Sequence, residues 1–473
     1  MTKKSIGELL FGLRGVTLPE EDKLSGFYKR MLAVAWPAAL EGMLVSLMNS
    51  FDTMMVGKIG PVAIAAVGLC AQPRMILLLL VQAVCVGTTS VIARRRGEER
   101  QDAAVSCLKQ SLALVTALGI LITVAGYFLA DPFLSLAGAN EETLPDARIY
   151  FRIVAAAFMA NCWSLCICAA QRGIGKTRIT MWVNMASNLI NVFFNYCLIG
   201  GHLGFPRMEV QGAALASAIG MGAGFLLALA TVVAPGKYKG YLHLSFHDSW
   251  RFDKESMRSI VKVGGNAAIE QFGVRFGFFV YARILFSLGT TMYAANQICM
   301  QLLSITFTFG DGLGVAATSL VGQNLGRKRA DLSMLYGKIS QRFAVMISLV
   351  LGVLIVSFRY QIAGWFIGEN TLNADQVVAY AASTMLVLAA IQPFQTSSVV
   401  LSGSLRGAGD NLYVALIATI CVSVVRPIMA VIAVYVLHLG LTGTWIFGLS
   451  EIALRFAFFY PRFASGKWKD KKV

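Results

Sequence analysis

The segment Ala38-Ala39-Leu40-Glu41 recurs as Ala267-Ala268-Ile269-Glu270, 229 residues further along the chain. The same offset relates the stretches near 31–106 and 260–335. Both copies are strongly apolar. Two apolar halves of similar size are typical of membrane carriers that work by alternating access. The repeat therefore predicts one helical architecture that the chain builds twice.

The duplication continues past this first register. Arg172-Gly173-Ile174-Gly175 returns as Arg406-Gly407-Ala408-Gly409 at an offset of 234. The larger offset means that a few residues are inserted between the two matches in the second copy. Matches in two registers indicate that the repeat covers most of the chain.

Composition places this repeat in a membrane. The 473 residues are 56% hydrophobic and 14% charged, and the mean hydropathy is +0.65. Soluble domains carry about 25% charged residues, so this chain lacks the charge to coat a soluble core of its size. Residues 1–30 contain no apolar core of a signal peptide, so we expect the first hydrophobic segment to insert and remain. The nine cysteines lack paired Cys-x-x-Cys spacing and are interpreted as small buried side chains rather than metal or disulfide ligands.

Twelve apolar stretches are long enough to cross a bilayer, which requires about 20 residues. They predict an all-α polytopic membrane protein with two six-helix lobes, related by a pseudo-two-fold axis along the membrane normal. The expected helices lie near 31–56, 63–93, 103–129, 147–170, 179–200, 210–234, 259–286, 292–322, 334–358, 376–403, 411–437 and 442–461. The predicted parts of the chain are an N-terminal segment, an N-lobe, a linker, a C-lobe and a tail, at 1–30, 31–234, 235–258, 259–461 and 462–473.

Lysine and arginine concentrate in alternate loops, which predicts how the helices are oriented. One set of loops and both termini hold most of the basic residues, and the opposite set holds only Lys58, Arg148, Arg152, Arg207 and Arg359. Both termini are therefore expected in the cytoplasm. The net charge of +16 then reflects membrane topology rather than nucleic-acid binding. In the polar linker, we expect His243 and His247 to be exposed rather than bound to a metal.

Two of the predicted helices carry polar residues along one face. Helix 31–56 contains Glu41, Asn49 and Asp52, at spacings of 8 and 3. Helix 179–200 has a stripe of asparagines spaced by 4, 3 and 4 residues, namely Asn184, Asn188, Asn191 and Asn195. One or two asparagines would be explained by hydrogen bonds between packed helices. Four in register favour the wall of a cavity, with helix packing as the alternative.

Asp52 is the strongest candidate for coupling transport to an ion. A carboxylate beside several amide oxygens can hold a desolvated cation, because hard cations prefer oxygen ligands. A carboxylate removed from water can also exchange a proton. Both chemistries point to Asp52, and the sequence alone leaves both open.

The second copy does not reproduce this site. Tyr281 stands at the repeat position of Asp52. The polar candidates that remain for a substrate cavity in the second copy are Glu270, Asp311, Gln392 and Gln395. This divergence predicts that the first copy carries the ion.

Intramembrane acids of the second copy have structural alternatives. Glu270 either faces substrate or pairs with Arg275 or Arg283 in its own helix. Glu451 and Arg455 are four residues apart on one helix, so we expect a structural ion pair between them.

Catalytic signatures are absent from the sequence. It contains no HExxH, no GxSxG and no GxxxxGK[ST] motif. We therefore expect a transporter rather than an enzyme, with no cofactor. The energy source is then an Na⁺ or H⁺ gradient rather than ATP hydrolysis on this chain.

Several motifs resemble those of one transporter family. They are Trp36-Pro37 followed by the run 52–60, Gly212 to Ser217, Leu320 to Gly326, and Leu405 to Asp410 with its earlier copy at 171–177. In these motifs the chain resembles the multidrug and toxic compound extrusion (MATE) transporters of the MOP superfamily, over nearly its whole length. The resemblance implies a twelve-helix, two-lobe fold and efflux of organic cations or drugs by antiport with Na⁺ or H⁺.

The resemblance also suggests roles for individual residues. In this family an acid of the first helix works with polar residues of helices five and six, and these positions correspond here to Asp52, Asn191, Asn195 and Ser217. Some members carry an acid in place of Asn195 and a threonine in place of Ser217, so Na⁺ and H⁺ both stay candidates. The helix 7 acid of one bacterial branch corresponds to Glu270, and its helix 10 acid corresponds to Gln395.

The hypothesis that follows is a monomeric, multi-pass protein of the inner or plasma membrane that exports small organic, cationic or amphipathic compounds. Its two lobes rock around a central cavity, and ion or proton entry at Asp52 displaces the substrate, since their binding must be mutually unfavourable. The coupling site is predicted at Asp52, Asn188, Asn191, Asn195 and Ser217. The substrate cavity is predicted at Glu41, Asn49, Asn184, Glu270, Tyr281, Asp311, Gln392 and Gln395. The main alternative is a MOP-superfamily flippase or exporter of a specific lipid-linked or metabolite substrate; a membrane enzyme and a channel are disfavoured.

Overall fold

The computed structural model describes residues 24–57, 59–234, 240–245, 250–366, 374–469 and 471. Much of the predicted N-terminal segment, part of the linker and the end of the tail lie outside these described residues, as do Lys58 and His247. Every regular element in the described part of the chain is a helix. The predicted all-helical fold class is therefore confirmed.

The chain divides into two compact units. We call Leu40–Ala268 the N-unit, and Met1–Ala39 together with Ile269–Val473 the C-unit. Both boundaries fall inside helices, α2 (Leu24–Gly57) and α10 (Lys254–Phe286). These two helices are repeat counterparts, and each begins in one unit and ends in the other.

Close backbone packing holds the first part of each of the two exchanged helices, the name used for α2 and α10 because each passes from one unit to the other. In the C-unit, a Cβ atom on Gly312 would lie 2.5 Å from the backbone nitrogen of Ala39. In the N-unit, a Cβ atom on Gly87 would lie 2.8 Å from the carbonyl oxygen of Ile260. Only glycine allows helix backbones to approach so closely, which is a common device between membrane helices.

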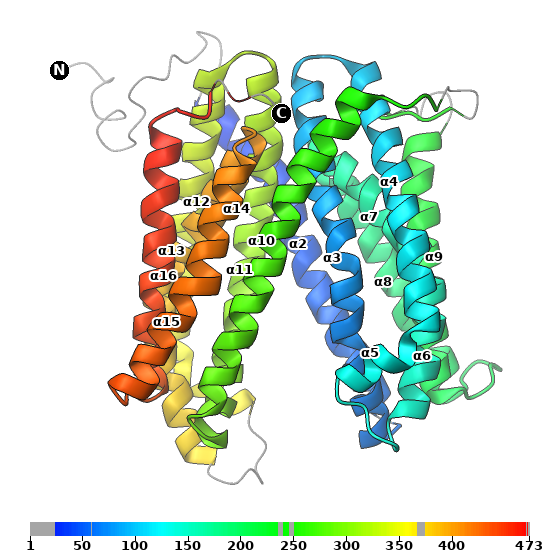
Figure 1. The fold of residues 1–473 in the computed structure, drawn as a ribbon, viewed down its shortest axis with the longest axis vertical. Helices are drawn as coiled ribbons and strands as arrows, with labels where there is room; N and C mark the ends of the chain where they lie inside the picture. Colours follow the sequence, from blue (N-terminus) through cyan, green and yellow to red (C-terminus); the bar gives the residue numbers. More distant parts are fainter. Residues whose placement is uncertain are drawn as a thin grey trace. The chain divides into compact units, whose positions relative to one another are not determined.

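The N-unit is a helical bundle around α7 (Figure 1). Helix α7 packs against α3, α4 and α9. Besides its shares of α2 and α10, the unit contains α3 (Pro61–Gly97), α4 (Gln101–Phe128), α5 (Ala130–Leu136), α6 (Leu144–Ala156), α7 (Phe158–Gly173), α8 (Thr177–Gly200) and α9 (Glu209–Val233).

The C-unit repeats this arrangement around α13 (Figure 1). Helix α13 packs against α11, α12 and α16, and like α7 it ends in the Arg-Gly motif of the repeat. Besides its shares of α2 and α10, the unit contains α11 (Thr290–Gly326), α12 (Ala330–Trp365), α13 (Ala374–Gly407), α14 (Asn411–Ile420), η2 (Cys421–Val425), α15 (Arg426–Val431), η3 (Ile432–Val436) and α16 (Leu441–Ala464).

Hydrogen bonds between helices are also duplicated. Thr89 Oγ1 donates to the carbonyl of Ala169 at 2.9 Å, and Thr318 Oγ1 donates to the carbonyl of Gly403 at 2.8 Å. Both members of the second pair are the repeat counterparts of the first. The sequence repeat therefore corresponds to a repeat of tertiary contacts.

Eight spans in the described residues are long and apolar enough to cross a membrane, and the bent pair α6–α7 makes a ninth if it is one span. The other three predicted spans coincide with α8, α10 and α16. These helices contain the asparagine stripe, Glu270 and the Glu451–Arg455 pair, and such residues lower their hydropathy or raise their charge. The total is consistent with twelve membrane helices.

Two predicted helices are not continuous. The predicted helix 147–170 is broken at Ala157, where α6 and α7 bend by 50°. The predicted helix 411–437 contains two π-helical turns, η2 directly before α15 and η3 directly after it. Pro427 near the start of α15 has no N–H, so it cannot donate to the carbonyl four residues earlier. Single π turns inside α-helices are rare and often occur at functional sites.

Candidate functional site

A ladder of polar contacts joins α2 to α8 in the N-unit. Asn184 Nδ2 donates to Glu41 Oε1 at 2.7 Å, and Asn195 Nδ2 donates to Asp52 Oδ1 at 2.7 Å. Both contacts join residues 143 apart in sequence, so the helices keep one register over 11 residues, about three turns. The predicted stripe on α8 therefore faces the acids of α2.

At one end of this ladder of contacts, Glu41 forms an ion pair. Glu41 pairs with Arg172 at the end of α7, with 3.3 Å between Oε1 and Nη1. Thr180 Oγ1 donates to Glu41 Oε2 at 2.8 Å, in addition to the bond from Asn184. Glu41 thus has a counter-ion and hydrogen bonds inside its own unit. The structure brings Glu41 and Asn184 together in a polar cluster, and neither residue lines the cavity beside Asp52.

At the other end of the ladder, the contacts centre on Asp52. In the orientation that satisfies both of its ends, the Asn191 amide donates to Asp52 Oδ1 at 2.8 Å and Oδ2 at 3.1 Å. Its oxygen then accepts from the backbone N–H of Ser217 at 3.2 Å. Together with Asn195, the amides of α8 provide the carboxylate with neutral donors. Four of the five predicted coupling residues are therefore assembled: Asp52, Asn191, Asn195 and Ser217.

An unused acceptor lies beside this carboxylate. Asn195 is almost fully buried, and its Oδ1 atom has no hydrogen-bond partner among the described residues. Buried polar atoms are rarely left unsatisfied, and exceptions often mark a site for an ion or water. A carboxylate with an adjacent free amide oxygen is a donor set that suits a hard cation or a protonated donor.

A cavity of 330 Å³ opens next to Asp52. Of the predicted residues, Asn49, Asp52 and Ser217 line it. Three polar residues that were not predicted from the sequence also line it, Thr53 on α2, Arg74 on α3 and Tyr150 on α6. The complete lining is Asn49, Asp52, Thr53, Val56, Ile64, Val67, Gly68, Cys70, Ala71, Arg74, Tyr150, Phe151, Val154 and Ser217.

Arg74 had a signal in the sequence. It is the only charged residue between Lys58 and Arg94, in a stretch that is otherwise apolar. Charged residues within membrane helices default to a functional role because of their cost in hydrocarbon. Tyr150 had no comparable signal, because a tyrosine in an apolar stretch is ordinary.

The middle of the asparagine stripe has a local role. Asn188 Nδ2 donates to the carbonyl of Asn184 at 2.7 Å, four residues earlier on α8. Asn184, Asn188, Asn191 and Asn195 are absent from the cavity lining, which consists of other described residues. The stripe therefore supports the acids of α2 from behind, instead of forming the cavity wall itself.

Glu270 in the C-unit pairs with a residue of another helix. Its Oε1 atom lies 2.5 Å from Nη2 of Arg406, at the end of α13. The alternative of a pair with Arg275 or Arg283 in its own helix is therefore wrong, because the residue nearby in sequence is not the residue nearby in the fold. Glu270–Arg406 is instead the repeat counterpart of Glu41–Arg172. Both glutamates follow directly after the point where their helix passes from one unit to the other.

A buried charge network occupies α15 and α16 of the C-unit. Glu451 is fully buried and lies 3.1 Å from Nε of Arg455, so the expected pair four residues apart is confirmed. It also pairs with Nη2 of Arg426 at 2.8 Å. Arg455 Nη2 donates to Gln395 Oε1 at 2.7 Å. Gln395 therefore belongs to an internal network with two arginines and one acid.

The remaining C-unit candidates are dispersed. Gln392 is buried and donates to Thr306 Oγ1 at 2.7 Å. Tyr281 is buried beside the guanidinium of Arg426, 5.5 Å from its ring centroid. Asp311 is exposed on α11. The structure does not gather these residues into one site.

The C-unit counterpart of the Asp52 cavity is almost filled. A void of 20 Å³ is lined by Tyr281, Met300 and Leu303, among others. These three residues are the repeat counterparts of Asp52, Ala71 and Arg74. The same place in the fold is thus open in the N-unit, where Asp52 and Arg74 line it. It is nearly closed in the C-unit, where Arg426 also lines the void but is paired with Glu451.

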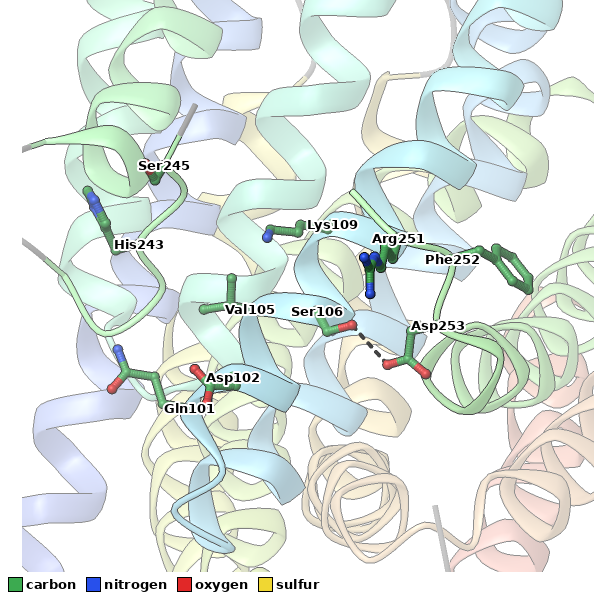
Figure 2. Close-up of a pocket in the computed structure, with 10 residues that line it drawn as sticks. All are labelled: Gln101, Asp102, Val105, Ser106, Lys109, His243, Ser245, Arg251, Phe252 and Asp253. Carbon is green, nitrogen blue, oxygen red and sulfur yellow. Dashed lines mark hydrogen bonds between the residues drawn. The ribbon is translucent and has the colours of Figure 1, made fainter. Parts of the chain in front are cut away.

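A second cavity of the N-unit lies where the linker enters α10 (Figure 2). It measures 590 Å³ and lies between α4 and the described linker residues. Ser106 Oγ of α4 donates to Asp253 Oδ2 at 2.8 Å, the bond drawn in Figure 2. Asp253 also accepts from the backbone N–H groups of Glu255 and Ser256, so it caps the start of α10. Hydrogen bonds from Ser256 and Ser106 hold the pKa of the Asp253 carboxyl below its usual value. This contact fixes the linker to the N-unit.

Comparison with known proteins decides the family. A model of the MatE family matches residues 37–197 and 267–432, one stretch in each copy of the repeat. The chain belongs to the MatE family. The suggested resemblance to MATE transporters is therefore confirmed.

Relatives of this MatE protein include several multidrug resistance proteins. It is 28% identical to the probable multidrug resistance protein NorM of Thermotoga maritima, over 96% of either chain. It is 30% identical to the corresponding protein of Shewanella oneidensis, over 82% of this chain and 83% of that one. It is 27% identical to the multidrug resistance protein PmpM of Pseudomonas aeruginosa, over 81% and 79%.

Solved structures share the fold of this MatE chain. A MOP superfamily transporter from Pyrococcus furiosus superposes with a TM-score of 0.85 at 22% identity, covering 99% of both chains. A multidrug resistance MATE transporter in an outward-facing conformation gives 0.85 at 22%, covering 96% of this chain and 98% of that one. The protein is thus a multi-pass membrane transporter and not an enzyme, as expected from the sequence.

Proposed function

We propose that this MatE protein exports small organic compounds, cationic or amphipathic, by antiport with Na⁺ or H⁺ through alternating access. The observation that carries the proposal is Asp52, placed at a cavity with amide donors behind it and a free amide oxygen beside it. The relatives named as multidrug resistance proteins support the substrate class.

Asp52 provides the coupling chemistry. With its carboxylate ionised, it attracts a cation or a proton, and Asn195 Oδ1 offers a second oxygen ligand for the cation. Binding of the ion removes the negative charge that holds a cationic substrate in the same cavity. Ion and substrate therefore disfavour each other, which is the condition for exchange between them.

The membrane arrangement belongs to the same proposal. The protein lies in the plasma or inner membrane as a monomer surrounded by lipid. Both of its termini are in the cytoplasm. The bias of basic residues toward one set of loops supports this orientation. Glu41 and Glu270 tie the two exchanged helices to their units and hold them firm while access alternates.

The test uses purified protein in liposomes loaded with a fluorescent organic cation. Na⁺ and H⁺ gradients are imposed separately, each with the membrane potential clamped. Efflux above protein-free liposomes under one gradient, and counterflow of labelled substrate without any gradient, are expected. Efflux that is independent of both gradients would contradict antiport, and the absence of counterflow would contradict a carrier.

A further inference from the structure

The cavity beside Asp52 contains a positive charge as well as a negative one. Arg74 on α3 and Asp52 on α2 both line the 330 Å³ cavity. The guanidinium is close enough to act electrostatically on the Asp52 carboxylate and on the Tyr150 hydroxyl. A cavity built only for cations would gain nothing from an arginine, because it repels them.

Asp52 and Arg74 do not form an ion pair with each other in the described residues. Asp52 instead accepts hydrogen bonds from Asn191 and Asn195. Arg74 likewise forms no hydrogen bond to any residue that the structure describes, although it is half-buried. An arginine presents five donors in a planar fork, which fits a carboxylate bidentately. Its donors are therefore available to a ligand in the cavity.

The repeat offers an internal comparison. Where the N-unit has Ala71 and Arg74, the C-unit has Met300 and Leu303, and the space shrinks from 330 to 20 Å³. The C-unit shows that an apolar side chain fits the position of Arg74 in this fold. The arginine is thus not required by the architecture, and its cost inside a membrane helix calls for a compensating partner.

We infer that the cavity binds zwitterionic ligands, with an anionic group on Arg74 and a cationic group facing Asp52. This inference rests on the proposed function and narrows its substrate class. A monocation meets one attractive and one repulsive charge in the cavity. A zwitterion satisfies both, and Arg74 is then the residue that determines specificity.

The test compares two ligands that differ in one charge. Ciprofloxacin carries a carboxylate and a piperazinium group, and its methyl ester keeps only the cation. Their affinities are measured by fluorescence on the same preparation of the purified full-length transporter, so their ratio does not depend on how much protein is folded. The variants are Arg74→Gln, Arg74→Lys and, as a control, Arg359→Gln, a partly exposed arginine whose hydrogen bond stays within its own helix.

We expect the wild type to bind the zwitterion at least tenfold more tightly than the ester. Arg74→Gln shifts this ratio at least tenfold toward the ester, Arg74→Lys shifts it less, and Arg359→Gln leaves it unchanged. An equal loss of both ligands in Arg74→Gln would show that Arg74 only balances Asp52 or supports the fold. That result, or a wild type that prefers the ester, would overturn the inference.

Transport assays separate this inference from the proposed function. Gradient-driven export of ethidium, without any preference for the zwitterion in binding, leaves the proposed function standing and refutes the role of Arg74. Arg74-dependent binding of the zwitterion without gradient-driven export of any ligand supports the role of Arg74 and refutes the antiport.

Discussion

The two copies of the repeat use the same place in the fold in opposite ways. In the N-unit, Asp52 and Arg74 line an open cavity, whereas in the C-unit Tyr281 and Leu303 help to close it. In the C-unit, Arg426 and Arg455 are instead paired with Glu451 in a buried network. The two copies of a duplicated fold can therefore take different roles. One copy keeps a cavity open to ligands, and the other is stabilised by internal ion pairs.

The largest effect is expected from removing the charge of Asp52. Asp52→Asn keeps the shape and the amide contacts but removes the group that attracts the coupling ion. Gradient-driven efflux in liposomes should fall at least a hundredfold, since about 2.7 kcal/mol of lost interaction corresponds to that factor. The counterpart variant Tyr281→Phe should retain efflux close to that of the wild type. Full gradient-driven efflux by Asp52→Asn would refute the assignment of ion coupling to the N-unit.

The buried network of the C-unit predicts the largest loss of stability. Glu451→Gln leaves Arg426 and Arg455 without their shared counter-ion, and breaking a buried pair in this way costs about 3–5 kcal/mol. The midpoint of thermal unfolding in detergent should fall clearly. Glu41→Gln is the matched control, because its arginine is more exposed and Thr180 and Asn184 stay as partners. Similar midpoints for both variants would contradict the conclusion that the buried ion pairs of Glu451 stabilise the C-unit more than the Glu41 pair stabilises the N-unit.

The sequence was sufficient for the architecture but not for the pairing of charges. The repeat marked Glu41, Arg172, Glu270 and Arg406 as equivalent positions, yet nothing in it showed that each glutamate pairs with the arginine of a distant helix. Those contacts depend on how α7 and α13 pack in the centre of their units. The periodicity of α8 did predict that its four asparagines share one face, because spacing along one helix directly determines a face. That this face meets α2 is a finding of the structure.

Cavities are harder to predict than faces. Arg74 was visible as an isolated charge, but that it lines the same cavity as Asp52 depends on the tertiary arrangement of α2 and α3. The break at Ala157 has no proline or glycine at its centre, so the bend had no local signal in the sequence. The asparagine stripe was expected to form a cavity wall, whereas it lies behind Asp52, because side chains of α3 and α6 complete the lining.

Glycines at equivalent positions should differ in how strictly they are required. A Cβ atom at Gly407 would lie 2.3 Å from the carbonyl oxygen of Thr318, and one at Gly173 would lie 2.8 Å from that of Thr89. Both distances force the helices apart, and overpacking of this kind costs about 1–3 kcal/mol. We expect Gly407→Ala to lower the thermal midpoint more than Gly173→Ala does. The reverse order would show that the C-unit packing yields more easily than its geometry indicates.

The smallest effect is expected from making the N-unit cavity resemble its counterpart. Ala71→Met places the side chain of Met300 at the equivalent position and reduces the space beside Asp52 without changing a charge. Ligand affinity should fall about tenfold, or 1.4 kcal/mol, while the thermal midpoint stays close to that of the wild type because the added atoms enter open space. The converse variant, Met300→Ala, should lower stability by about 2–5 kcal/mol through the cavity it creates. It should bind no additional ligand, because Tyr281 and Leu303 offer no charge and the guanidinium of Arg426, which also lines the void, is already paired with Glu451. Binding gained by Met300→Ala would mean that space alone, and not the pair of Asp52 and Arg74, distinguishes the two copies.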